Sequence, residues 1–178
     1  MDLQKTPISI SIALIILLGF IIYGNSLDGK FMWDDEKLIE ENTYIKEWRH
    51  IKEIFTENIG KGAGEKSNFY RPLQMLTYMI DYSLWKLDAR GYHLTNIFLH
   101  ILVALGIFYL VSILFKDTLL SFLASIFFVV HPIHAGPTNY ISARANSLVA
   151  VFMLLTLIFY IKALDTKKLS LYLGMLLT

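Results

Sequence analysis

The sequence predicts an all-α protein, a polytopic bundle of membrane-spanning helices with one large polar loop after the first span. Of its 178 residues, 55% are hydrophobic, whereas soluble domains average about 45–50%. The charges are concentrated, because 12 of the 15 acidic and 10 of the 16 basic residues lie between Asn25 and Tyr92. Apolar segments therefore surround a single charged segment, which is typical of a membrane protein with one sizeable extramembrane loop.

Five apolar segments are predicted to be spans. The first is near the lower limit of about 17 residues for a spanning helix, and no small-residue cleavage site follows it, so we interpret it as an uncleaved anchor. The third is short and is expected to continue through His131 and Pro132 in protein-lined surroundings. The last stops at Thr178 in the middle of a span, so the chain is expected to be the N-terminal part of a larger transmembrane domain. The expected spans are 8–23, 93–115, 118–131, 140–161 and a truncated 169–178.

Orientation follows from the lysines in the short loops, since cytoplasmic loops are enriched in Lys and Arg. One side carries Lys5, Lys116, Lys162, Lys167 and Lys168. The short loop 131–139 carries no Lys or Arg. We therefore expect a cytoplasmic N-terminus in a prokaryotic cell membrane, with loop 25–92 in the periplasm or cell exterior, or in the ER lumen of a eukaryote.

Two amphipathic helices are predicted within this loop, both suited to the membrane interface. Residues 44–59 place one set of apolar side chains at helical spacing. A second helix is expected to open at Pro72, a residue favoured in the first turn. The predicted apolar faces are Ile45, Trp48, Ile51 and Phe55 in the first helix, and Leu73, Leu76, Ile80 and Leu84 in the second.

An acidic pair, Asp34 and Asp35, follows the first span almost directly. A carboxylate held at the membrane face can act as a general base or hold a metal, and a lipid-linked substrate could reach it there. The alternative interpretation is a solvated turn or a helix N-cap, because Asp is favoured in both.

Polar side chains also occur where lipid is expected. His93, Asn96 and His100 follow at i, i+3 and i+7 and so share one side of a helix. Intramembrane ionisable groups usually face a bundle interior or a water-filled cavity, although a structural pair of histidines is the alternative. His131 and His134 could ligate a metal, but two ligands do not make a site, and a turn between spans explains them equally well.

Arg144 lies about one turn into the fourth span and needs an anionic partner there. Asp34, Asp35 or a lipid phosphate are the candidates, and Arg71, beside Tyr70, is expected at the same level. Snorkelling to lipid headgroups is the alternative.

These residues occur in an order that resembles a known family. The chain resembles the N-terminal part of the GT-C polytopic membrane glycosyltransferases, and among them the tetratricopeptide-repeat transmembrane protein O-mannosyltransferase-like family. The matching stretches are Phe31–Asp35 with Asn42, Tyr70–Leu73, Gly91–Asn96 with His100, His131–His134, and Ile141–Arg144.

The resemblance implies an enzyme that moves a sugar, with mannose as one candidate, from a polyprenyl- or dolichyl-phosphate donor on the outer face of the membrane. The acceptor would be a hydroxyl, with protein serine or threonine as one candidate. By the same resemblance an acid in the first outer loop is the base or a metal ligand, which assigns Asp34, with Asp35 as the alternative. The residues expected to bind substrate are Tyr70, Arg71, His93, Asn96, His131, His134 and Arg144.

The sequence departs from the family pattern at two places. It has Ala135–Pro137 where Thr-Glu is common, and Asn146 where an acid is common. No residue is assigned to a metal, and use of a divalent metal stays open.

Three functions therefore remain to be compared. A glycosyltransferase would have the lipid-linked donor, a protein or glycan acceptor and membrane lipids as partners. A transporter or channel could use His93, His100 and Arg144 as a pathway, but no internal symmetry supports it. A non-catalytic membrane scaffold is the third. With a net charge of +1 and no basic blocks, no nucleic acid partner is expected, and the absence of cysteine excludes disulfides and thiolate metal sites.

Overall fold

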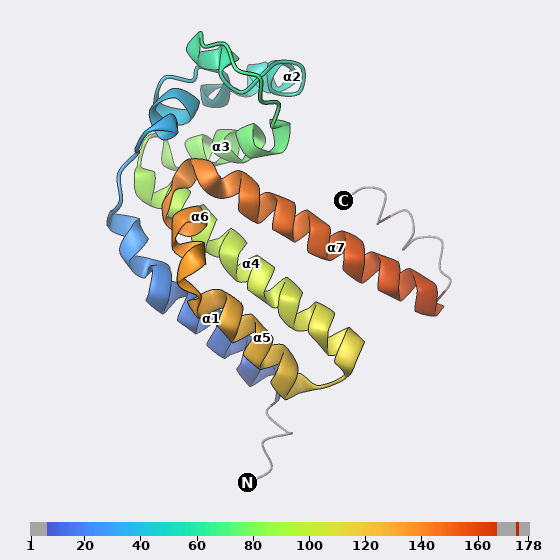
Figure 1. Cartoon of the computed structure of the whole chain (residues 1–178). Helices are drawn as coiled ribbons and strands as arrows, with labels where there is room; N and C mark the ends of the chain where they lie inside the picture. Colours follow the sequence, from blue (N-terminus) through green and yellow to red (C-terminus); the bar gives the residue numbers. More distant parts are fainter. Residues whose placement is uncertain (1–6, 167–173, 175–178) are drawn as a thin grey trace.

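The computed structural model describes residues 7–166 and 174, and this part of the chain is helical with no β-strand (Figure 1). Among these residues, three helical segments are long and apolar enough to cross a membrane, namely Ile8–Asp28, Ala89–Phe115 and Ile141–Leu164. The predicted all-α membrane bundle is thereby confirmed. The expected fifth span, 169–178, lies outside the described residues except for Gly174.

Four apolar helices form the bundle in the part of the chain that the structure describes. Helix α1 (Ile8–Tyr23) continues into a 3₁₀-helix, Gly24–Asp28. Helix α4 (Ala89–Phe115) begins four residues before the expected 93, because the Asp88 side chain caps it by accepting a hydrogen bond from the Arg90 amide at 3.1 Å. Helix α5 (Thr118–Val130) has 13 residues and is shorter than a spanning helix. A 3₁₀ turn, Ile141–Ala143, leads into α7 (Arg144–Thr166).

Helix α4 is the central element, in contact with α1, α5 and α7 (Figure 1). The approach of α1 is close, since a Cβ atom built on Gly19 would lie 2.5 Å from Ile101. A side chain at position 19 would therefore require Ile101 or one of the two helices to shift. Apolar side chains from α1, α4 and α5 fill the space between them, with Ile15, Ala104, Phe108 and Val129 buried.

The polar loop is folded and lies at one end of the bundle (Figure 1). Its elements are a π-helix Glu36–Glu40, 3₁₀-helices Tyr44–Lys46, Trp48–His50 and Lys61–Ala63, α2 (Ile51–Ile54) and α3 (Pro72–Trp85). The loop has its own core, which also includes Tyr92 of α4 and Ile141 at the start of α7. The loop is thus packed directly onto the ends of two spans.

The predicted helix over residues 44–59 is wrong. The backbone is extended at Glu47 (φ −140°, ψ 130°), and this divides the segment into short turns. Ile45 and Ile54 enter the loop core, whereas Trp48, Ile51 and Phe55 are exposed. Apolar spacing alone could not separate one amphipathic helix from several turns that bury two isoleucines.

Helix α3 begins at Pro72 as predicted, but its apolar stripe faces outward. Leu73, Ile80 and Leu84 are exposed. The buried face instead carries Gln74, Met75, Tyr78, Met79 and Asp81. Three of these buried side chains, Gln74, Tyr78 and Asp81, carry polar groups, which indicates a polar site in the protein interior.

The connection between α5 and α7 lies at the same end of the bundle as the loop (Figure 1). Helix α5 ends at Val130, and the chain turns through a 3₁₀-helix, Pro132–His134, and α6 (Ala135–Asn139). The His131 side chain caps this turn by accepting the Ile133 amide hydrogen at 3.3 Å. Residues far apart in the sequence therefore meet at this end.

Candidate functional site

The two adjacent carboxylates have different environments. Asp35 is 1% exposed, and its Oδ1 accepts hydrogen bonds from the Ser142 amide at 2.9 Å and from the Ser142 hydroxyl. Its Oδ2 accepts the Met32 amide hydrogen at 3.1 Å. Burial raises the pKa of the Asp35 carboxyl, and these hydrogen bonds oppose the rise. Asp35 thus joins the loop to the start of α7, and we call this residue with its bonds to Met32 and Ser142 the Asp35 anchor.

Asp34 is exposed, and its carboxylate has no hydrogen-bond or ion-pair partner within the described residues. Its backbone amide donates to the Tyr140 hydroxyl at 3.2 Å. The main chain at Asp34 is therefore fixed while the side chain remains free to reach a substrate.

The residue before this pair is strained. Trp33 has φ +53°, and a bulky side chain in this region costs about 1–3 kcal/mol. The Asp35 bond to the Met32 amide and the Asp34 bond to Tyr140 hold the turn on both sides of Trp33. After the turn the chain enters the π-helix Glu36–Glu40, a rare form that occurs often at functional sites.

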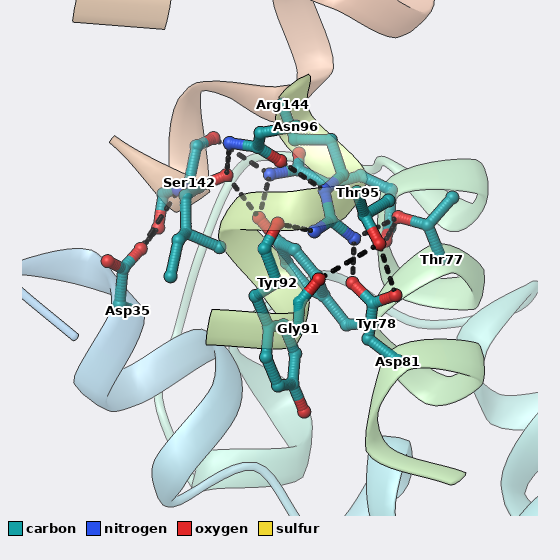
Figure 2. Close-up of polar contacts among 12 residues, drawn as sticks. Asp35, Thr77, Tyr78, Asp81, Gly91, Tyr92, Thr95, Asn96, Ser142 and Arg144 are labelled. Atoms are coloured by element: carbon teal, nitrogen blue, oxygen red, sulfur yellow. Dashed lines mark hydrogen bonds and ion pairs between the residues drawn. The ribbon is translucent and has the colours of Figure 1, made fainter. Parts of the chain in front are cut away.

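Arg144 is completely buried at the centre of a polar cluster (Figure 2). Its guanidinium forms an ion pair of 2.6 Å with Asp81 of α3. It also donates to Asn96 Oδ1 at 2.8 Å, to Thr77 Oγ1 at 3.0 Å and to the Tyr92 carbonyl at 2.9 Å. We call Thr77, Asp81, Tyr92, Asn96 and Arg144 the Arg144 cluster.

The prediction that Arg144 pairs with Asp34, Asp35 or a lipid phosphate is wrong. Its carboxylate partner is Asp81, not Asp34 or Asp35, and no lipid phosphate is needed to balance its charge. Snorkelling is also excluded in this structure, because the side chain is 0% exposed. The prediction from sequence considered only Asp34 and Asp35. The spacing of Gln74, Tyr78 and Asp81 along one face of α3 was a signal that could have identified Asp81 as the partner.

The Arg144 cluster is continuous with the Asp35 anchor. Asn96 Nδ2 donates to the Tyr140 carbonyl at 3.2 Å. Gln74 Nε2 donates to the Ser142 carbonyl at 2.9 Å, and the Tyr78 hydroxyl donates to the Ile141 carbonyl at 3.2 Å. Burial raises the pKa of Tyr78 to about 12, so its hydroxyl keeps its proton. The segment that binds Asp35 is therefore held from α3 and α4 together (Figure 2).

Three of the four candidate histidines, His100, His134 and His131, lie in a row of ring contacts. His100 stacks on Phe128 with ring centroids 4.8 Å apart, and His134 lies 5.7 Å from His100 and 6.0 Å from His131. Burial lowers the pKa of His134. His93 is buried, and neither of its ring nitrogens has a hydrogen-bond partner among the described residues. His93, Asn96 and His100 are all buried, so they share the buried side of α4, as their spacing predicts.

Tyr70 and Arg71 line an apolar pocket of about 590 Å³ between the start of α3 and α7. Leu148, Phe152 and Met153 form much of its α7 side. The Arg71 guanidinium lies 4.6 Å from the centre of the Phe69 ring and makes no ion pair within the described part of the chain. Gln74 lines the same pocket and donates to Ser142, so the pocket is one residue away from the Asp35 anchor.

Residues 7–166 contain no group of three or more His, Cys, Asp or Glu side chains that could hold a metal ion. Both oxygens of Asp35 are already used as acceptors for Met32 and Ser142. The described residues by themselves therefore do not form a metal site of this kind.

The fold and the site define a helical membrane protein in which a folded polar loop closes over a buried ionic cluster at one end of the bundle. The chain is 34% identical over 158 residues to human protein O-mannosyl-transferase TMTC1, covering 86% of the chain and 18% of that protein. It is 33% identical over 160 residues to TMTC2 of Xenopus laevis and 34% identical over 155 residues to mouse TMTC3. The predicted resemblance to the O-mannosyltransferase-like family is confirmed by these relatives.

The chain spans 17–19% of the length of these three relatives. All three come from animals, so they give no support to the expected prokaryotic membrane. No family model and no solved structure matches the chain.

Proposed function

We propose that this chain forms part of the active site of a GT-C-type glycosyltransferase, which transfers mannose from a polyprenyl-phosphate donor to a serine or threonine hydroxyl of a protein. The observation that carries this proposal is the exposed Asp34 carboxylate beside the buried Asp35, whose partner Ser142 also accepts a hydrogen bond from Gln74 in the lining of the apolar pocket. The names of the relatives support the sugar and the acceptor class.

Asp34 is the general base in this proposal. A hydroxyl is a poor nucleophile, so a carboxylate must take its proton as it attacks. The acceptor oxygen then bonds to C1 of the sugar, the bond between C1 and the phosphate oxygen breaks, and polyprenyl phosphate leaves with the electron pair. Asp35 cannot take this part in the present geometry, since it is buried and both its oxygens accept hydrogen bonds. It is a positioning residue.

Arg71 is the phosphate contact. It is the cation that lines the pocket, and the apolar wall formed with α7 suits the first part of a polyprenyl chain. A guanidinium binds phosphate through paired hydrogen bonds and stabilises the charge that develops on the leaving group. Arg144 positions the Ser142 segment instead, because its charge is balanced by Asp81. His93, Asn96, His131 and His134 support the same end of the bundle.

We place this end on the outer face of the membrane. Lys116 follows the far end of α4, and Lys162 lies in the last turns of α7, also away from Asp34. Lysines at that end favour the cytoplasmic side for it.

The test uses the full-length protein in proteoliposomes, with radiolabelled polyprenyl-phosphate mannose and a serine/threonine peptide. Asp34→Asn is expected to lower the transfer rate by about 10²–10⁴-fold, the usual contribution of a general base. Glu36→Gln, an exposed acid two residues away, is the matched control and keeps full activity. Arg71→Gln raises the KM for the donor and leaves the KM for the peptide unchanged.

Full activity of Asp34→Asn contradicts the proposal. Solute flux without any sugar donor would identify a transporter instead. If neither transfer nor donor binding responds to changes at both Asp34 and Asp35, the chain is a scaffold.

A further inference from the structure

Trp33 is the most exposed large apolar side chain among the described residues, at 78%. Its indole meets the Tyr140 ring edge-on, with centroids 5.4 Å apart and planes at 72°. An edge contact covers little of the ring system, so a broad indole face is open immediately beside the exposed Asp34.

The backbone of Trp33 is unusual for its location. Three described residues other than glycine have a positive φ: Trp33, Lys86 and Lys116. Lys116 ends α4 in the left-handed conformation that is common at helix C-termini, and Lys86 ends α3 with φ +55° and ψ −120°. Trp33 instead precedes a helix, and its side chain gains almost no burial from the strained turn. Strain that is held by neighbouring contacts and yields no packing is typical of a functional position.

A membrane-anchoring role does not explain this position well. Interfacial tryptophans anchor to lipid headgroups without requiring a strained backbone. Two exposed acids, Asp34 and Glu36, lie within three residues of Trp33, and acidic groups are repelled by anionic lipid surfaces.

An open indole face beside a carboxylate suits a sugar ring. The C–H bonds of one hexose face carry partial positive charge and pack against the negative face of an aromatic ring, while the hydroxyls at the ring edge are bound by polar neighbours. The same location beside the base is where C1 of the donor sugar must lie when the acceptor attacks.

We propose that Trp33 is the sugar-binding platform of this site, against which the hexose ring of the lipid-linked donor stacks next to Asp34. This inference rests on the proposed function. It explains the strained turn, because the left-handed backbone at Trp33 presents the indole to the substrate. In this conformation Asp34 and Asp35 keep their contacts with Tyr140 and Ser142.

The key variant is Trp33→Gly in the full-length protein, assayed with polyprenyl-phosphate mannose and a serine/threonine peptide. Glycine adopts positive φ without strain, so the ring is removed and the backbone conformation is retained. We expect kcat/KM for the donor to fall by about tenfold, as the loss of one aromatic contact implies. The thermal unfolding midpoint stays the same or rises. Trp33→Phe keeps the donor KM within about threefold of wild type, since a smaller ring can still stack.

The matched control is Trp48→Ala, which removes another exposed tryptophan of the same loop and leaves the donor KM unchanged. An unchanged donor kcat/KM in Trp33→Gly overturns the inference, as does a change confined to the kcat/KM for the peptide, which would make Trp33 an acceptor contact. A lower unfolding midpoint also overturns it, because the ring would then be structural. If wild type transfers mannose and Asp34→Asn does not, a failure at Trp33 leaves the proposed function intact. Absence of transfer by the wild-type protein removes both.

Discussion

The Arg144 cluster and the turn that carries Asp34 differ in how their charged groups are partnered. In the cluster, a fully buried guanidinium is matched by Asp81, Asn96, Thr77 and a backbone carbonyl. In the turn, a carboxylate is left exposed on a backbone that is fixed and locally strained. The two regions therefore have different roles. The fully paired groups of the Arg144 cluster fix the geometry of the Ser142 segment, whereas the unpaired, exposed Asp34 carboxylate is available for chemistry. Ser142 and Asp35 connect the two regions.

Breaking the buried ion pair should have the largest effect on stability. Arg144→Met leaves the Asp81 carboxylate buried without a cation, which costs about 3–5 kcal/mol. Asp81→Leu leaves Arg144 uncompensated and is expected to cost a similar amount. Thermal and denaturant unfolding in detergent would measure both. The double variant should be less destabilised than the sum of the two, and simple additivity would contradict a direct coupling between them.

Removing the Asp35 anchor should have a smaller effect. Asp35→Ala leaves the Ser142 amide, the Ser142 hydroxyl and the Met32 amide without their acceptor, at a cost of about 1–3 kcal/mol. The same unfolding measurement applies, with Ser142→Ala as the milder comparison because it removes one of the three bonds. Transfer activity should also fall in Asp35→Ala, since the turn that presents Asp34 is released. Wild-type stability and activity in this variant would show that Asp35 holds nothing in place.

Stability should also depend on pH through Asp35. Because burial raises the pKa of this carboxyl in the folded protein, the unfolded chain loses its proton first as the pH rises. The free energy of unfolding therefore decreases from about pH 4 up to the raised pKa, with a slope of at most about 1.4 kcal/mol per pH unit from this group. Asp35→Asn lacks this group, so the difference in unfolding free energy between wild type and variant should change across that range. A difference that is flat with pH would contradict the raised pKa.

Asp34 should have the smallest effect on stability and a large effect on activity. Its side chain is exposed and without a partner among the described residues, so Asp34→Asn is expected to change the free energy of unfolding by less than about 0.5 kcal/mol. Combined with the loss of transfer described above, this would separate the two adjacent acids by experiment. A destabilisation as large as that of Asp35→Ala would make Asp34 a second structural anchor.

Much of the fold could be predicted from local pattern. Long uncharged segments and the Pro72 helix start are properties of neighbouring residues, and they appear as α1, α4, α7 and α3. The helix predicted over 44–59 failed because its apolar spacing fits both a single helix and a series of turns, and only the burial of Ile45 and Ile54 in the loop core chose between them.

The sequence by itself determined that this is a helical membrane protein with a charged loop, that an acidic pair follows the first span, and that Arg144 requires an anion. These conclusions follow from composition, spacing and the cost of burying charge. The tertiary structure alone decided that the anion is Asp81, 63 residues away in the chain, and that Asp35 is a buried anchor while Asp34 is exposed. Adjacent residues of the same type are equivalent in a sequence, and only the contact of Asp35 with the Ser142 segment, which α3 and α4 hold in place, makes the two different.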